Sequence, residues 1–174
     1  MSIIVKDGSQ RLWTHVVQEA EKECAAFVPQ ALEQYLAGLL ERYVAHSAIA
    51  NRVLAIAYLE ALQHRAHERA ALLQAVGDEC LLFAGLYPLQ SEKKGVATDY
   101  FVKLGRTAYQ VVSHQTNDLC AMLSSQFVLL ADILQTIRKE PDLLPLEAYE
   151  RWQKTGSLRA YKMLLLYTKG VAIK

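Results

Sequence analysis

The chain has 174 residues, a length that suits one domain with a single sizeable hydrophobic core. Hydrophobic residues make up 52% of it and charged residues 21%, a balance that excludes an intrinsically disordered chain. The formal net charge of +1 argues against a protein whose main task is to coat nucleic acid or an anionic surface.

The composition favours helices throughout the chain. Only 4 Pro and 8 Gly interrupt a sequence in which Ala and Leu are abundant, and these two residues suit helices better than sheets. No internal repeat and no shift in composition divides the chain. We therefore predict an all-α fold, in which residues 1–174 form one bundle of six to eight helices.

The N-terminal third is predicted to contain three helices. Residues 1–8 hold only a short apolar stretch, and we expect a flexible arm there, followed by a helix capped by Ser9. Pro29 is expected in the first turn of the second helix, whose apolar residues recur at offsets of three and four. Residues 49–63 are apolar on several sides around Tyr58, so the third helix is expected to lie centrally or to face two neighbours.

The next predicted helix covers residues 66–86 and carries Gly77 on its apolar side. A glycine in a helix interior costs about 1 kcal/mol relative to Ala, and a close crossing of two helices is the usual compensation. Gly85 followed by Pro88 is a stop signal. A linker is expected over residues 87–97.

The helical pattern that follows is too long to be one helix. From Thr98 to Arg138 it would span about 60 Å, whereas a domain of this size has a radius of gyration of about 16 Å. We expect a break around residues 114–118, where the apolar content falls. Pro145 then opens a short helix, and Gly156 and Ser157 form a stop and a new cap before the last helix.

Cysteine usage and hydropathy indicate a cytoplasmic protein. Cys24, Cys80 and Cys120 are far apart and odd in number, so we expect free buried thiols rather than a disulfide framework or a cysteine metal site. No apolar run of signal-peptide length begins the chain. No stretch approaches ~18 uninterrupted apolar residues, so we expect no transmembrane segment.

Several short patterns resemble an uncharacterised family of bacterial all-helical proteins. They are Val76-Gly77-Asp78, Phe83-Ala84-Gly85-Leu86-Tyr87-Pro88, Asp99-Tyr100-Phe101 with Gly105 and Ala108-Tyr109, Tyr35-Leu36-x-x-Leu39-Leu40, and Trp152-x-x-Thr155-Gly156-Ser157. Together they cover most of the chain, although Leu86 and Phe101 depart slightly from the aromatic residue usual there. The resemblance implies an all-helical bacterial cytoplasmic protein and carries no activity.

A ligand site is most plausible where Gly, Pro, Asp and Tyr concentrate, between Val76 and Tyr109. Asp78 lies in an apolar helical run, so it must be paired or hydrogen-bonded, or its pKa rises. It is either a site acid or a carboxylate that pairs with Arg106 or a tyrosine hydroxyl and locks a helix crossing. We favour the structural role.

The candidate ligand-binding residues are Asp78, Asp99, Tyr100, Arg106 and Tyr109. Asp99 and Arg106 are seven positions apart and share a helix face, and Arg106 could hold a carboxylate or phosphate. Tyr100 and Tyr109 are nine apart, so their rings diverge by roughly 180° and form no single stripe.

A metal centre is the next alternative. On a continuous helix, Glu60, His64, His67 and Glu68 would lie along one side, and a second helix would have to supply more ligands, such as Asp99, His114 or Asp118. The spacing is not Glu-x-x-His and no second copy of it appears. We therefore prefer an exposed polar face and predict no metal and no cofactor.

The C-terminal segment is locally basic and amphipathic. It holds Arg151, Lys154, Arg159, Lys162, Lys169 and Lys174 against Glu150. Such a segment could touch nucleic acid, an anionic membrane or a protein partner. Most basic helix faces are only solvated, and we expect no nucleic-acid partner.

The sequence contains no catalytic constellation, nucleophile elbow or Gly-rich phosphate loop. We therefore expect a non-enzymatic interaction or scaffold protein, a homo-oligomer or the partner of another protein. One alternative is a small-molecule or lipid-binding module with a pocket near Asp78, Tyr100 and Arg106. Another is a metal-dependent helical enzyme that uses His64 and His67.

Overall fold

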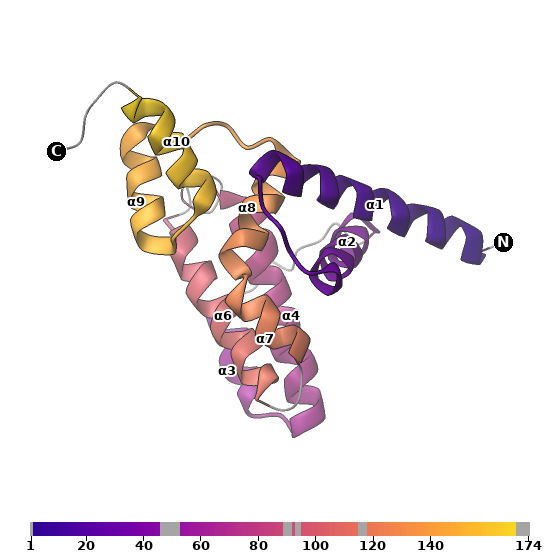
Figure 1. Cartoon of the computed structure of the whole chain (residues 1–174). Coiled ribbons are helices and arrows are strands. Elements are labelled where there is room, and N and C mark those ends of the chain that lie inside the picture. Colours follow the sequence, from indigo (N-terminus) through magenta and orange to yellow (C-terminus); the bar gives the residue numbers. More distant parts are fainter. Residues whose placement is uncertain (1, 46–52, 89–91, 93–94, 115–117, 170–174) are drawn as a thin grey trace.

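The computed structural model describes residues 2–45, 53–88, 92, 95–114 and 118–169. Its helices are α1 (Ser2–Cys24), α2 (Gln30–Ala45), α3 (Leu54–Leu62), α4 (Ala66–Leu86), α6 (Thr98–Ser113), α7 (Asp118–Ser125), α8 (Phe127–Arg138), α9 (Pro145–Thr155) and α10 (Leu158–Thr168). Figure 1 shows their arrangement.

The predicted all-α class is confirmed, whereas the predicted number of helices is slightly low. Nine helices occur in the described parts of the chain, instead of six to eight. The additional helix arises because the segment that follows residue 118 breaks at Gln126, where α7 and α8 meet at a bend of 69°. The Ser125 hydroxyl donates to the Met122 carbonyl one turn earlier, a local bond that often accompanies bends in helices. The Ser124 hydroxyl donates instead to the Arg106 carbonyl of α6.

The helix ends agree with most of the sequence signals. α6 ends at Ser113 and α7 begins at Asp118, so the predicted break is present, although residues 115–117 lie outside the described residues. Gly156 ends α9 in a left-handed conformation, and the hydroxyl of Ser157 caps α10 by accepting from the Ala160 N–H. Of the predicted linker, residues 89–91 and 93–94 also lie outside the described residues.

The prediction for the N-terminus was wrong. α1 begins at Ser2 rather than after a cap at Ser9, so the expected flexible arm belongs to the helix. Residues 2–8 carry no proline, and the apolar residues among them suit a helix as well as an arm.

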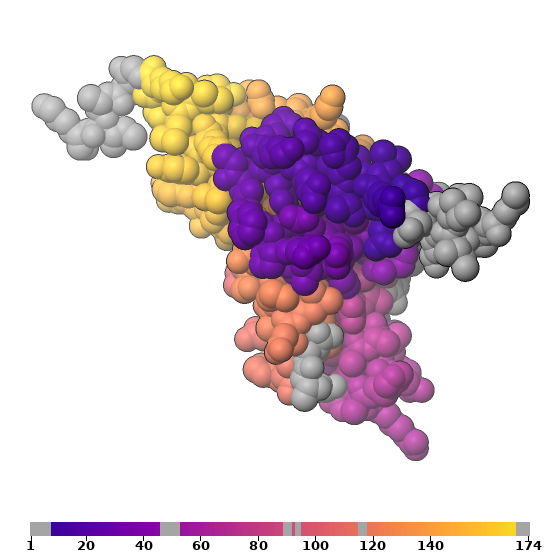
Figure 2. Space-filling view, turned by 45° about the vertical axis from the view of Figure 1, so that its right-hand side comes forward, coloured from indigo at the N-terminus to yellow at the C-terminus, as the bar shows by residue number. Residues whose placement is uncertain are grey.

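The centre of the molecule is the pair α4 and α6, which pack along each other (Figure 1). α3 and α8 pack against α4, α7 packs against α6, and α1 packs against α2 and α8. Figure 2 shows α1 and α2 covering one face, with the magenta and orange helices extending below them.

Two glycines allow α4 and α6 to approach closely, as the sequence predicted. A Cβ on Gly77 would lie 2.6 Å from the Tyr109 ring. A Cβ on Gly105 would lie 2.5 Å from the Phe127 ring and 2.8 Å from the Cβ of Cys80. These distances are too short for a carbon atom, so the packing of α4, α6 and α8 depends on hydrogen at both positions.

The last two helices form a hairpin at the opposite end of the molecule from α3 (Figure 1). The α9–α10 hairpin has a small core of its own, made by Leu143, Ala148, Ala160 and Met163. One connection to the rest of the chain is the ion pair, at 2.7 Å, between Arg151 of α9 and Glu92 in the segment between α4 and α6.

Among the described residues, no single helix is long and apolar enough to cross a membrane. The bent pair α7 and α8 passes the same test of length and composition only when the two helices are taken together.

The glycine contacts give a first prediction. Gly105→Ala should lower the free energy of unfolding by about 1–3 kcal/mol, because the methyl group collides with a rigid ring and a Cβ atom. Gly38→Ala in α2 is the matched control, since nothing lies within 4 Å of its added Cβ; it should gain about 0.5–1 kcal/mol from helix propensity. Urea unfolding followed by circular dichroism measures both. Equal effects of the two substitutions would contradict the proposed packing constraint.

Candidate functional site

The predicted site acid, Asp78, lies at the crossing of α4 and α6. Its Oδ1 accepts hydrogen bonds from the hydroxyls of Tyr35, at 2.5 Å, and Tyr109, at 2.7 Å. The amide of Gln74 donates to the Tyr35 hydroxyl at 2.9 Å. One carboxylate therefore connects α2, α4 and α6.

The cation nearest to this carboxylate is Arg42, not Arg106. The Arg42 guanidinium lies 3.6 Å from Asp78 Oδ2 and over the Tyr35 ring. Arg106 is exposed, and its main-chain carbonyl accepts a hydrogen bond from Ser124. The suggested ion pair between Asp78 and Arg106 does not form, and Asp78 pairs with Arg42 of α2 instead. The expected hydrogen bond from a tyrosine hydroxyl is present twice.

Burial governs the acidity of this cluster. Loss of solvent raises the pKa of Asp78 above its usual range, although the two tyrosine hydroxyls and Arg42 oppose that rise. Burial and the nearby carboxylate also raise the pKa of Tyr35 and Tyr109, so both phenols stay protonated and donate. The arrangement suits a structural bond between helices better than acid–base catalysis.

The five candidate ligand-binding residues do not converge on one site. Tyr109 is fully buried beside Asp78, whereas Tyr100 is 37% exposed, as their nine-residue spacing predicted. Asp99 forms an ion pair with Lys103 at 3.1 Å on the outer side of α6. Only Asp78 and Tyr109 are brought together.

The histidines considered for a metal centre lie where the helix is interrupted. α3 ends at Leu62 and α4 begins at Ala66, so Glu60 and His67 do not share one continuous helix. His64 contacts Glu68, with 3.3 Å between Nδ1 and Oε2. Within the described ranges, no group of three or more His, Cys, Asp or Glu side chains could hold a metal ion.

A pocket of about 630 Å³ lies between the C-terminal end of α1, one face of α8 and α10. α8 contributes Leu129, Asp132, Thr136 and the following Lys139. α10 contributes Leu158, Arg159, Lys162, Met163 and Leu166. The volume falls within the usual range for small-molecule sites, about 300–1,000 Å³.

The wall of this pocket contains a buried polar network. Asp132 is only 2% exposed and accepts from the Ser157 hydroxyl, at 2.7 Å, and from the Arg159 main-chain N–H, at 3.2 Å. The Arg159 guanidinium donates to the Glu140 carbonyl, at 2.7 Å, and to Gln135. Burial raises the pKa of Asp132 and lowers the pKa of Arg159. The network joins α10 to α8.

Sequence reasoning did not identify this pocket. Asp132 and Gln135 were visible as polar residues in an apolar helical pattern, the same signal that drew attention to Asp78. Their partners Ser157 and Arg159 lie more than twenty positions further along the chain, and no spacing rule connects them. The three cysteines are free, as expected; Cys80 and Cys120 are buried, and Cys24 is half-buried in the pocket wall.

A second surface feature is an apolar stripe on the hairpin, which we call the hairpin outer face. It is formed by Leu146, Tyr149, Trp152, Leu158, Tyr161 and Leu165, which are between 38% and 66% exposed. The Trp152 ring lies between those of Tyr149 and Tyr161, with centroid distances of 6.3 and 5.3 Å. Aromatic contacts therefore join the two helices on their solvent side.

No family model matches the chain, no curated protein matches it in sequence, and no solved structure matches it. The resemblance to bacterial helical proteins therefore stays a prediction.

One further titratable group lies between α1 and α2. Glu21 is 6% exposed, and its Oε1 has no hydrogen-bond partner within the described part of the chain. Burial raises its pKa from the usual 4.5 to about 7, and the nearby Glu33 carboxylate adds to this rise.

The Asp78 cluster can be tested by two substitutions at one position. Asp78→Ala should lower the free energy of unfolding by about 1–3 kcal/mol, because two buried tyrosine hydroxyls lose their acceptor. Asp78→Asn keeps a carbonyl oxygen in place and should cost less. Denaturant unfolding of both variants provides the comparison. If Ala were tolerated as well as Asn, the cluster would not be the bond between helices described above.

The pKa of Glu21 predicts how stability changes with pH. The folded state binds the Glu21 proton more tightly than the unfolded chain does, so stability from this group is present below about pH 4.5 and is lost as the pH rises through about 7. Glu21→Gln removes the titration and should make the protein more stable than the wild type at pH 8, by roughly 1–2 kcal/mol. Near pH 4 the two should unfold alike. Melting temperatures across this range test the prediction, and a pH-independent difference would refute it.

Proposed function

We propose that this chain is a non-enzymatic helical interaction protein that associates with a second copy of itself through the hairpin outer face. The observation that carries the proposal is the distribution of exposed apolar residues. Of the 16 large hydrophobic residues exposed in the described structure, 9 lie between Leu144 and Tyr167. Exposed apolar surface gathered in one place is typical of interaction sites.

Comparison with a second apolar patch supports this choice of surface. α3 exposes Val53, Ile56 and Leu59, each more than half, on the helix that the sequence shows to be apolar on several sides. These three aliphatic residues make a smaller patch than the six residues of the hairpin outer face, three of which are aromatic. An aromatic side chain brings roughly 150–250 Å² to such a contact.

The size of the hairpin outer face indicates a reversible dimer. Stable interfaces bury about 800 Å² per partner, and smaller ones are weak or transient. Both patches fall below that range, and the hairpin outer face is the larger of the two. Tyr and Trp are also the residues that most often dominate binding energy at interfaces.

Charge supports a second copy as the partner. Glu150 and Lys154 are exposed on α9, one turn apart, and line a pocket with Glu92, Asp99 and Arg151 beside the hairpin. In a two-fold pairing of two copies, a contact of Glu150 with Lys154 of the other copy would occur twice. Opposite charges at this edge are therefore compatible with a second copy as the partner.

Light scattering coupled to size-exclusion chromatography, over a wide range of protein concentrations, tests the proposal. The wild type should change from monomer to dimer as the concentration rises. Leu165→Glu should stay monomeric, because a carboxylate is placed in the centre of the apolar stripe. Leu12→Glu is the matched control on α1, where Leu12 is 61% exposed, and it should dimerise like the wild type. A wild type that is monomeric throughout would overturn the proposal.

A further inference from the structure

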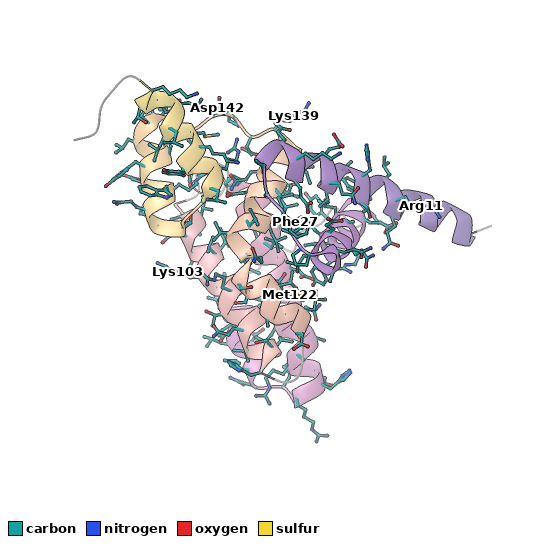
Figure 3. The ribbon with its side chains drawn as sticks, in the orientation of Figure 1. Arg11, Phe27, Lys103, Met122, Lys139 and Asp142 are labelled. Atoms are coloured by element: carbon teal, nitrogen blue, oxygen red, sulfur yellow. The ribbon has the colours of Figure 1, made fainter. Side chains whose placement is uncertain are left out.

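The pocket between α1, α8 and α10 has no role in the proposed dimer. The segment that joins α8 to α9 contributes Lys139, Glu140 and Asp142 to the lining of the pocket. Figure 3 shows Lys139 on this segment near the C-terminal end of α1, and Asp142 on it near α10.

The charges in the pocket are not equally compensated. Asp132 is bonded by Ser157 and the Arg159 main chain, and Glu140 forms an ion pair with Arg138 at 3.0 Å. The Arg159 guanidinium lies close enough to Asp132 and Asp142 for their charges to act on its pKa. Four carboxylates line the pocket, and two of them, Asp132 and Glu140, therefore have close partners in the chain. The positive charge of Arg159 acts on both Asp132 and Asp142.

The two lysines differ from these carboxylates. Lys162 donates to the main-chain carbonyl of Cys24, a neutral group at the end of α1. Lys139 is exposed and forms no ion pair with another described residue. The lining thus holds four carboxylates and three cationic side chains, and of these cations the two lysines form no ion pair with another described residue.

The remaining wall is apolar and partly exposed. Leu158 and Leu166 are 51% and 64% exposed although both line the pocket, and Leu129 and Met163 lie beside them. A ligand that covered these side chains would remove apolar surface from water, at about 25 cal/mol for each Å² buried. The wall therefore favours an aliphatic group next to the two ammonium groups.

We propose that this pocket binds an amphipathic carboxylate, with the carboxylate held by Lys139 and Lys162 and an aliphatic chain against Leu129, Leu158, Met163 and Leu166. The pocket differs from the Asp78 region considered from the sequence. Its ligand chemistry goes beyond the proposed self-association, and only Leu158 is shared with the hairpin outer face.

The test uses three probes of equal chain length: octanoate, octan-1-ol and octylamine. Binding is measured by isothermal titration calorimetry, with the melting temperature as a second readout. Octanoate should bind most tightly and raise the melting temperature, the alcohol should bind more weakly, and the amine most weakly. Equal binding of the three probes, or none of octanoate, would overturn the proposal.

Two variants locate the carboxylate. Lys139 has a positive φ of 56°, a conformation that glycine adopts without strain, so Lys139→Gly removes the ammonium group and retains the backbone. Lys139→Gly and Lys162→Gln should each weaken octanoate binding by about tenfold and leave octan-1-ol unchanged. Lys103→Gln on α6, far from the pocket, is the control (Figure 3). If both variants bound octanoate like the control, the site assignment would be wrong, whatever the oligomeric state of the protein.

Discussion

The close crossing of α4 and α6 is the constraint on which the rest of the structure depends. Without a side chain at Gly77, the Tyr109 ring lies directly on α4, and this brings its hydroxyl to Asp78. Tyr35 reaches the same carboxylate from α2. A packing requirement at a glycine and a buried hydrogen-bond acceptor one residue later therefore fix three helices together.

A second buried carboxylate has the same role for the hairpin. Asp132 accepts from Ser157, and the same Ser157 hydroxyl caps α10. The first turn of α10 is thus formed and attached to α8 by one side chain. Both carboxylates have raised pKa values because of burial, and in both cases the donors come from neighbouring helices. Polar residues within the apolar faces of α4 and α8 therefore serve as hydrogen-bond acceptors between helices.

The proposed functions rest on two features of the surface, the hairpin outer face and the pocket between α1, α8 and α10. The hairpin has its own small core and exposes aromatic and aliphatic side chains on the opposite side. Its attachment to α8 and α1 forms the pocket. The hairpin outer face and the pocket therefore meet on α10, where Leu158 belongs to both.

The sequence by itself determined the helical class, the break before Asp118, the cap at Ser157 and the need for close packing at Gly77 and Gly105. These features depend on residues near one another in the chain, through periodicity, capping and the absence of a side chain. The tertiary structure decided which cation and which tyrosines meet Asp78, that α7 and α8 bend at Gln126, and that Asp132 and Lys162 face one pocket. Those outcomes depend on contacts between distant segments. The 3.6-residue period shows which side of a helix is apolar, but not which neighbour that side will contact.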